Sequence, residues 1–117
     1  MRFYKTILAI GFVLFFVSAS FALSIGEVVG SYRCYSYNVG GRGGNCRTFT
    51  TKFILNGDGS YTFGTSQGTF KIKKDQILFS QEKQRGAATF FDGNKFAFTY
   101  TLPSNGWKVE QTYLRIE

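Results

Sequence analysis

Alternation of apolar and polar residues with a period of two constrains this chain more than any other feature. Residues 95–102 (KFAFTYTL) show it most clearly, because every second residue is aromatic or aliphatic and the residues between are polar or small. The apolar side holds Phe96, Phe98, Tyr100 and Leu102, and the other side holds Lys95, Ala97, Thr99 and Thr101. This pattern predicts a β-strand with one face in the core.

Similar segments follow one another along the chain, separated by turn residues at short intervals. Asn56-Gly57-Asp58-Gly59, Lys74-Asp75 and Asp92-Gly93-Asn94 are typical of tight turns between antiparallel strands. Only residues 24–29 suggest a short helical turn. We expect eight strands, at residues 31–37, 47–55, 60–63, 69–73, 76–80, 87–91, 95–102 and 107–116.

Short links between successive strands favour an antiparallel meander. Pairing the first strand with the last would remove both exposed sheet edges, so we predict an all-β, eight-stranded up-and-down barrel, with a two-sheet β-sandwich as the alternative. A barrel of this size is just wide enough for side chains to fill, so we expect little or no cavity. The expected filling is Phe53, Phe63, Phe70, Phe79, Phe96 and Phe98.

The N-terminus has the pattern of a secretory signal peptide. Arg2 and Lys5 precede an unbroken apolar stretch at residues 7–17, and small residues follow it. We expect cleavage after Ala22, with Ala19 as a second candidate and an uncleaved signal anchor as the alternative. The mature chain would be one domain, residues 23–117, with no membrane span. It would be secreted or periplasmic and without a lipid anchor, since no cysteine lies near the cleavage site.

Two cysteines, Cys34 and Cys46, are the only ones in the chain. In an oxidising compartment an even pair in so small a domain predicts a disulfide. A redox-active thiol is the alternative, but the sequence has neither a CxxC motif nor a histidine beside them.

Composition argues against most enzymes. The chain contains no histidine, which removes the commonest general base and metal ligand, and two cysteines cannot complete a thiolate metal site. Three of the seven acidic residues, Asp58, Asp75 and Asp92, fall in expected turns. We therefore predict a non-enzymatic protein with no cofactor and no metal.

A glycine-rich segment, Gly40-Gly41-Arg42-Gly43-Gly44, lies between the cysteines. It lacks the helix and Lys-Ser/Thr pair of a phosphate-binding loop, so we expect a mobile hairpin loop pinned by the disulfide. Loops on a rigid scaffold often carry binding residues. The candidate partner-binding residues are Tyr35, Tyr37 and Arg42.

The chain has 14 Lys and Arg against 7 Asp and Glu, a net charge of +7. Lys71, Lys73 and Lys74, with Lys83 and Arg85 nearby in sequence, form its densest basic region. They are candidates for a patch that binds an anionic surface, although a solvated outer face explains them more simply. Nucleic acid is not an expected partner, because the chain offers no recognition helix or RNA-binding fold.

Gly30-Ser31-Tyr32 opens the first expected strand, and Tyr113-Leu114-Arg115 lies in the last. With the meander, this resembles lipocalin-like (calycin) barrels, in which a Gly-x-Trp on the first strand packs against Arg or Lys from the last. Tyr32 stands where the family has Trp, and the chain is far shorter than a lipocalin. The resemblance implies that Arg115 lies over the Tyr32 ring and closes the barrel beside Gly30.

These features together predict an exported, monomeric binding module that acts through its loops or outer surface on a protein or an envelope component. A carrier of small apolar molecules in the lipocalin manner is one alternative. A secreted inhibitor of a protease or hydrolase is the other.

Overall fold

A computed structural model describes residues 23–46 and 50–117. The expected signal peptide, residues 1–22, lies outside the described residues. Over the described ranges the chain forms one short helix and nine strands. They are α1 (Ile25–Val28), β1 (Gly30–Val39), β2 (Arg42–Asn45), β3 (Lys52–Leu55), β4 (Ser60–Phe63), β5 (Ser66–Lys73), β6 (Gln76–Phe79), β7 (Ala88–Phe91), β8 (Lys95–Thr101) and β9 (Lys108–Arg115).

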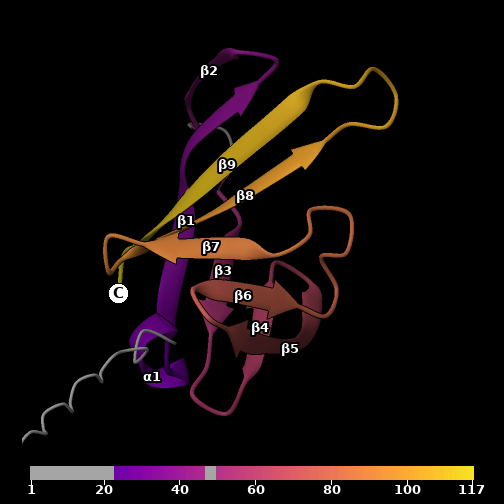
Figure 1. The fold of residues 1–117 in the computed structure, drawn as a ribbon. Coiled ribbons are helices and arrows are strands. Elements are labelled where there is room, and N and C mark those ends of the chain that lie inside the picture. Colours follow the sequence, from indigo (N-terminus) through magenta and orange to yellow (C-terminus); the bar gives the residue numbers. More distant parts are fainter. Residues whose placement is uncertain (1–22, 47–49) are drawn as a thin grey trace, which may run out of the picture.

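The sheet is a closed antiparallel barrel, as the edge argument predicts, and not a sandwich. Strands β3 to β9 each pair with their neighbour in sequence, β1 pairs with β3, and β1 also pairs with β9. The first and last barrel strands therefore lie side by side, and the ring of eight strands has no open seam (Figure 1). At the closure, Tyr32 is opposite Arg115 and Val39 is opposite Val109.

The ninth strand, β2, corrects the expectation of a loop at the glycine-rich segment. Gly40 and Gly41, with φ of 62° and 87°, form a tight turn that glycine accepts without strain. The chain then pairs back on β1, with Val39 opposite Arg42. Gly43 is required in this strand, because a Cβ there would lie 1.9 Å from the Tyr37 carbonyl oxygen. The Cys34–Cys46 disulfide, which is present as predicted, joins the end of this hairpin to β1.

The second predicted strand, 47–55, is shorter in the structure. Residues 47–49 lie outside the described residues, and β3 begins only at Lys52. Thr50 and Thr51 precede it without belonging to a strand.

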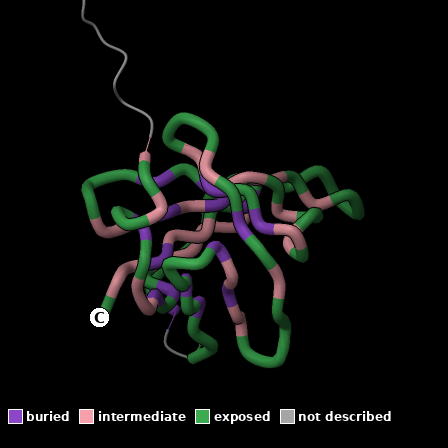
Figure 2. Tube along the Cα trace, turned by 90° about the horizontal axis from the view of Figure 1, so that it is seen from below, coloured by how far each residue is buried: buried purple, intermediate pink, exposed green. Residues whose placement is uncertain are grey.

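Aromatic side chains fill the barrel interior. Phe53 lies at the centre, 4.1 Å from the Phe63 ring centroid, 4.9 Å from that of Tyr113 and 5.1 Å from that of Phe79. Figure 2 shows the buried residues gathered in the middle of the molecule and the exposed ones along the projecting loops. Five of the six expected phenylalanines are buried, and Phe63 is partly buried. The core also contains Tyr32, Tyr61, Tyr113, Leu55, Ile77, Ala88 and Phe90.

One end of the barrel is closed by α1. Val28 is fully buried, and Leu23 and Ile25 pack against the same core. The Tyr32 hydroxyl donates a hydrogen bond of 2.8 Å to the Val28 carbonyl, which ties β1 to the helix. Among the described residues, no helix has the length and apolar character needed to cross a membrane.

Arg115 completes this closed end. Its guanidinium carbon lies 5.3 Å from the Tyr32 ring centroid, and Nη2 donates to the Tyr32 hydroxyl at 2.8 Å and to the Glu27 carbonyl. Gly30 makes room for this contact: its φ is +147°, and a Cβ would lie 2.6 Å from the Glu117 carbonyl oxygen and 3.1 Å from the Arg115 Cδ. The three residues that the resemblance singles out thus meet at one place in the structure.

Candidate binding pocket at the open end of the barrel

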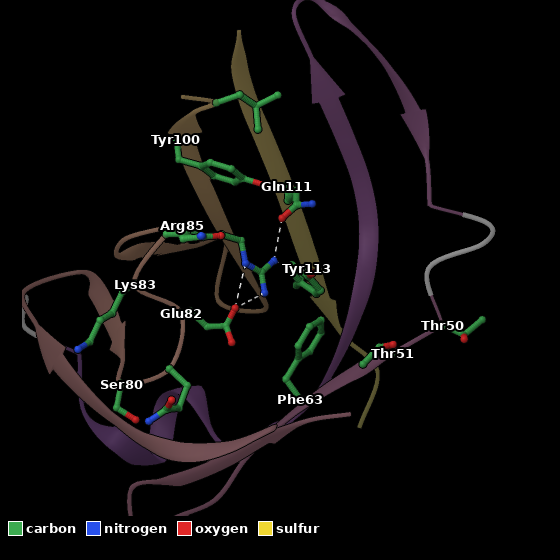
Figure 3. Close-up of a pocket in the computed structure, with 13 residues that line it drawn as sticks. Thr50, Thr51, Phe63, Ser80, Glu82, Lys83, Arg85, Tyr100, Gln111 and Tyr113 are labelled. Carbon is green, nitrogen blue, oxygen red and sulfur yellow. Dashed lines mark hydrogen bonds and ion pairs between the residues drawn. The ribbon is translucent and has the colours of Figure 1, made fainter. Parts of the chain in front are cut away.

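The other end of the barrel, away from α1, is hollow. A pocket of about 730 Å³ opens there, which we call the mouth pocket. The interior is filled as expected, but a pocket opens above Arg85, where Phe63 and Tyr113 are among the lining residues (Figure 3). The lining residues are Thr50, Thr51, Phe63, Ser80, Gln81, Glu82, Lys83, Gln84, Arg85, Tyr100, Leu102, Gln111 and Tyr113.

The loop between β6 and β7, residues 80–87, brings charged side chains into the mouth pocket. A compact turn folds it, in which the Arg85 and Gly86 amides both donate to the Glu82 carbonyl at 3.1 Å. Gly86 has a φ of +75°, which lets the chain leave the turn toward β7. The Gln81 amide donates to the Tyr61 hydroxyl at 3.2 Å and so anchors the loop to the barrel wall.

This turn places Glu82 and Arg85 against each other below the rim. Their side chains are only 12% and 13% exposed, and Arg85 Nε and Nη2 donate to Glu82 Oε1 at 3.1 and 2.6 Å. Arg85 Nη1 donates to Gln111 Oε1 at 2.8 Å and to the Tyr113 hydroxyl at 3.0 Å. The charge of the guanidinium is therefore neutralised at its own site.

The same guanidinium lies on the aromatic core. Its carbon is 4.3 Å from the Phe98 ring centroid, and the centroids of Phe63, Phe53 and Tyr113 follow at 5.2, 5.4 and 5.8 Å. Aromatic faces carry negative charge density and attract a cation, most strongly where water is excluded. Arg85 is thus the floor of the mouth pocket and the cover of the aromatic core.

The pKa values of Arg85 and Tyr113 are both raised. Burial disfavours the charged guanidinium, but the neighbouring Tyr113 and Glu82, together with the hydrogen bonds that they accept, outweigh burial and raise the pKa of Arg85. Burial also raises the pKa of Tyr113, although the neighbouring Arg85 acts in the opposite direction. The guanidinium is therefore charged and the Tyr113 hydroxyl keeps its proton.

Several polar atoms on this floor retain hydrogen-bonding capacity. Glu82 Oε2 can accept, the Gln111 amide group can donate twice, and the Tyr113 hydroxyl can donate once. Within residues 23–46 and 50–117, none of these has a protein partner for that capacity. The pocket thus offers both donors and acceptors to a bound molecule.

The three candidate partner-binding residues do not form one surface. Tyr35 is 53% exposed at a β-bulge, where the β1–β9 register shifts between Cys34 and Ser36, whereas Tyr37 packs against the hydrophobic core. Arg42 is exposed at the start of β2. None of the three lines the mouth pocket.

The basic region also divides. Lys71 and Lys73 are exposed on β5, and Lys74 follows in the turn to β6 with a φ of 59°. Lys83 stands at the rim of the mouth pocket. Arg85 does not belong to a surface patch at all, because it points into the barrel.

Sequence reasoning missed the residues that make the floor, namely Glu82, Arg85, Gln111 and Tyr113. The available signal was weak: a carboxylate and an arginine three residues apart, followed by Gly86, in a loop without periodicity. The sequence signal for Gln111 and Tyr113 is clearer, since every second residue of β9 from Gln111 to Arg115 lies on its inner face. In the described part of the chain, no three His, Cys, Asp or Glu side chains gather as a metal site would require.

Comparison with models of known protein families, with curated proteins and with solved structures finds no match. The class that the structure itself defines is a small closed β-barrel with a disulfide-linked extra strand and a pocket at one end. Function therefore has to be argued from that pocket.

Proposed function

We propose that this chain is an exported, non-enzymatic, lipocalin-like binding protein that holds a small molecule in the mouth pocket. The observation that carries the proposal is the pocket itself: about 730 Å³, with an aromatic floor and polar groups available to a ligand. Ligand pockets are typically ~300–1,000 Å³ and combine apolar walls with a few placed polar groups. Of the functions considered from the sequence, small-molecule binding best explains a barrel that is filled at one end and hollow at the other.

Further features support export, the lipocalin-like arrangement and the non-enzymatic role. The disulfide fits an oxidising compartment and hence export. The contact of Tyr32 with Arg115 beside α1 fits the lipocalin-like arrangement of first and last strands. A non-enzymatic role is supported by the carboxylate that lines the pocket in the described part of the chain, Glu82, because it is paired with Arg85.

The test compares a variant that blocks the mouth pocket with a matched variant on the outer wall. Gln84 lines the pocket and is exposed, whereas Gln67 is exposed on β5 opposite Thr62, facing away from the interior. The exported protein, with its disulfide formed, is incubated with the small-molecule extract of its native exported fraction and examined by native mass spectrometry. A mass adduct that Gln84→Trp abolishes and Gln67→Trp retains is the expected result.

One specific observation favours a second function, which is binding of a protein or envelope partner through the outer surface. Tyr35 and Trp107 are each 53% exposed, and Trp107 lies over Gly40, with ring atoms 3.1 Å from where a Cβ would stand. These aromatic residues suit a protein or envelope partner bound through the β1–β2 hairpin, including a protease or hydrolase held in an inhibited complex. Absence of any adduct, together with a protein complex that Gln84→Trp leaves intact and Trp107→Ala weakens, would favour this function over ours.

A further inference from the structure

The hydrogen-bonding groups on the floor of the mouth pocket restrict the class of ligand. We infer that the pocket accepts a neutral, hydroxyl-rich molecule, a short saccharide, which stacks on its aromatic wall and bonds to Glu82, Gln111 and Tyr113. This inference rests on the proposed small-molecule function and specifies its ligand. It follows from charge, from hydrogen-bonding capacity and from the aromatic wall, taken in turn.

Charge argues against an anionic ligand. Arg85 has five N–H donors, and the hydrogen bonds to Glu82, Gln111 and Tyr113 occupy four of them. Carboxylate and phosphate are held best by two parallel N–H groups of one guanidinium, which Arg85 no longer presents. Among the lining residues that the structure describes, the other cation is Lys83, which is exposed at the rim.

A cationic ligand fits no better. Glu82 is the acidic residue of the lining as described for residues 23–46 and 50–117, and Arg85 Nη2 lies 2.6 Å from its Oε1. An ammonium group placed on Glu82 Oε2 would therefore meet the field of the guanidinium at close range. The floor suits a ligand without net charge.

The remaining capacity matches hydroxyl groups. A hydroxyl donates one hydrogen bond and accepts two, so a polyhydroxylated ligand can satisfy the Glu82 acceptor and the Gln111 and Tyr113 donors together. A purely apolar ligand would bury these groups without partners, at about 1–3 kcal/mol for each group. The inference thus also departs from an apolar carrier.

The aromatic wall completes the match. Tyr100 and Phe63 both line the pocket, and in Figure 3 their rings lie on either side of the guanidinium. Phe63 is stacked on Phe53 at 4.1 Å and has the Arg85 guanidinium carbon 5.2 Å from its ring centroid, so Tyr100 is the better placed ring for stacking. A sugar ring has an apolar C–H face and a polar rim, so its C–H face gains from contact with the negatively charged face of an aromatic ring. Further polar residues around the mouth, Thr50, Thr51, Ser80, Gln81 and Gln84, are placed to contact the outer rings of an oligosaccharide.

The experiment titrates isotopically labelled full chain, with its disulfide formed, and follows backbone amide resonances. The neutral probes are chitotriose, cellotriose and maltotriose, and the contrasting probes are trigalacturonate, inorganic phosphate and decanoate. We expect at least one neutral trisaccharide to shift the amides of residues 80–85 and 111–113, and the contrasting probes to leave them in place.

Variants then test the contacts. Gln111→Met should weaken saccharide binding about tenfold, as loss of roughly 1.4 kcal/mol implies, while the same substitution at exposed Gln67 should leave it unchanged. Tyr100→Leu should also weaken binding, and Tyr35→Leu, on the outer surface, should not. Thermal unfolding of each variant verifies that the barrel is intact, and Tyr100→Leu decides the matter if Gln111→Met unfolds.

Each outcome has a distinct meaning. If decanoate or phosphate shifts the pocket amides and no saccharide does, the ligand class is wrong although small-molecule binding stands. If a saccharide shifts the Trp107 and Tyr35 region instead, the mouth pocket is not the saccharide site. If none of the six probes shifts the pocket amides, the saccharide inference is overturned, and the adduct experiment decides separately whether the pocket binds any small molecule.

Discussion

Replacing Arg85 with methionine should strongly destabilise the barrel although Arg85 lies in a loop. Methionine keeps the length and apolar character of the arginine stem and removes only the guanidinium. The substitution removes both hydrogen bonds to Glu82 Oε1 and those to Gln111 and Tyr113. It also removes the contact of the guanidinium with the Phe98 ring at 4.3 Å. Glu82, 12% exposed, would then be left with a nearly buried carboxylate and no counter-charge.

The magnitude follows from that burial. Removing one partner of a buried ion pair costs about 3–5 kcal/mol, and a pair that can reach pocket water belongs at the lower end of this range. We therefore expect Arg85→Met to lower the free energy of unfolding by about 3 kcal/mol. For a domain of this size, 1 kcal/mol corresponds to roughly 4–8 °C, so Tm should fall by about 12–24 °C.

The decisive assay is a double-mutant cycle with Glu82→Gln, measured by thermal and urea unfolding of the oxidised protein. In the natural chain, Glu82→Gln should destabilise by about 1–2 kcal/mol, because a neutral amide replaces a charged acceptor. In the Arg85→Met background the same change should stabilise by about 1 kcal/mol, because it removes an uncompensated charge. The reasoning is refuted if Glu82→Gln destabilises in both backgrounds or if Arg85→Met costs less than about 1 kcal/mol.

Three further predictions concern the rest of the barrel. Gly30→Ala should lower the free energy of unfolding in urea by about 3 kcal/mol, because its Cβ would lie 2.6 Å from the Glu117 carbonyl oxygen. The control Gly26→Ala should be neutral or stabilising, because nothing lies nearer than 3.9 Å to the added Cβ. Equal effects of the two substitutions would contradict this prediction. Reducing the Cys34–Cys46 disulfide should cost about 3 kcal/mol and raise hydrogen exchange in β2 before the barrel strands, and uniform exchange would argue against β2 as a separately held strand. Stability should fall as pH rises above about 10, because burial raises three tyrosine pKa values and the folded state then holds protons that the unfolded state has lost. The three residues are Tyr32, Tyr61 and Tyr113. Tyrosinate absorbance should therefore grow together with loss of the circular dichroism signal. Ionisation of these three residues without unfolding would contradict the prediction.

The barrel was predictable because its rules are local. A strand with one face on a packed interior and one on water must alternate, and β8 does so over its whole length. Turn residues determine the hairpins, as at Asp58, whose Oδ1 accepts a hydrogen bond from the Ser60 amide at 2.9 Å. The hydrogen bonds that the Asp58 carboxylate accepts from Ser60 also lower the pKa of Asp58. Closure followed from the cost of free edges, which only pairing of β1 with β9 removes.

Strand β2 was not predictable in the same way. Its sequence, Arg-Gly-Gly-Asn, has poor intrinsic preference for a strand, and all four residues are exposed. It forms because β1 runs past the barrel to Val39, where β3 no longer pairs with it, and because the disulfide holds the returning chain there. Tertiary pairing thus overrides local propensity in a segment that composition assigns to a loop.

The pocket escaped prediction for a different reason. In a strand, period two says which side chains face inward, but the loop after β6 has no period, so Lys83 and Arg85 look alike in the sequence. Lys83 is exposed, whereas Arg85 is partly buried on Phe98, since the turn at Glu82 aims their side chains in different directions. The hollow mouth likewise depends on how far this loop enters the barrel.

The contrast between two partly buried arginines, Arg115 and Arg85, supports the proposal that the open end is the binding end. Arg115 and Arg85 both contact inward-facing residues of β1 or β9, at opposite ends of the interior. Arg115 bonds to the Glu27 carbonyl and to Tyr32, whose own hydroxyl donates to the Val28 carbonyl, so that end is sealed by α1. The partners of Arg85, in contrast, keep unused hydrogen-bonding capacity, and no helix covers Arg85 within the described residues. A protein that needed only stability could have sealed both ends with apolar side chains, because a buried ion pair is a weak source of stability. The proposed ligand binding would account for the Arg85–Glu82 pair, and the double-mutant cycle and the saccharide titration test its contribution to stability and to binding separately.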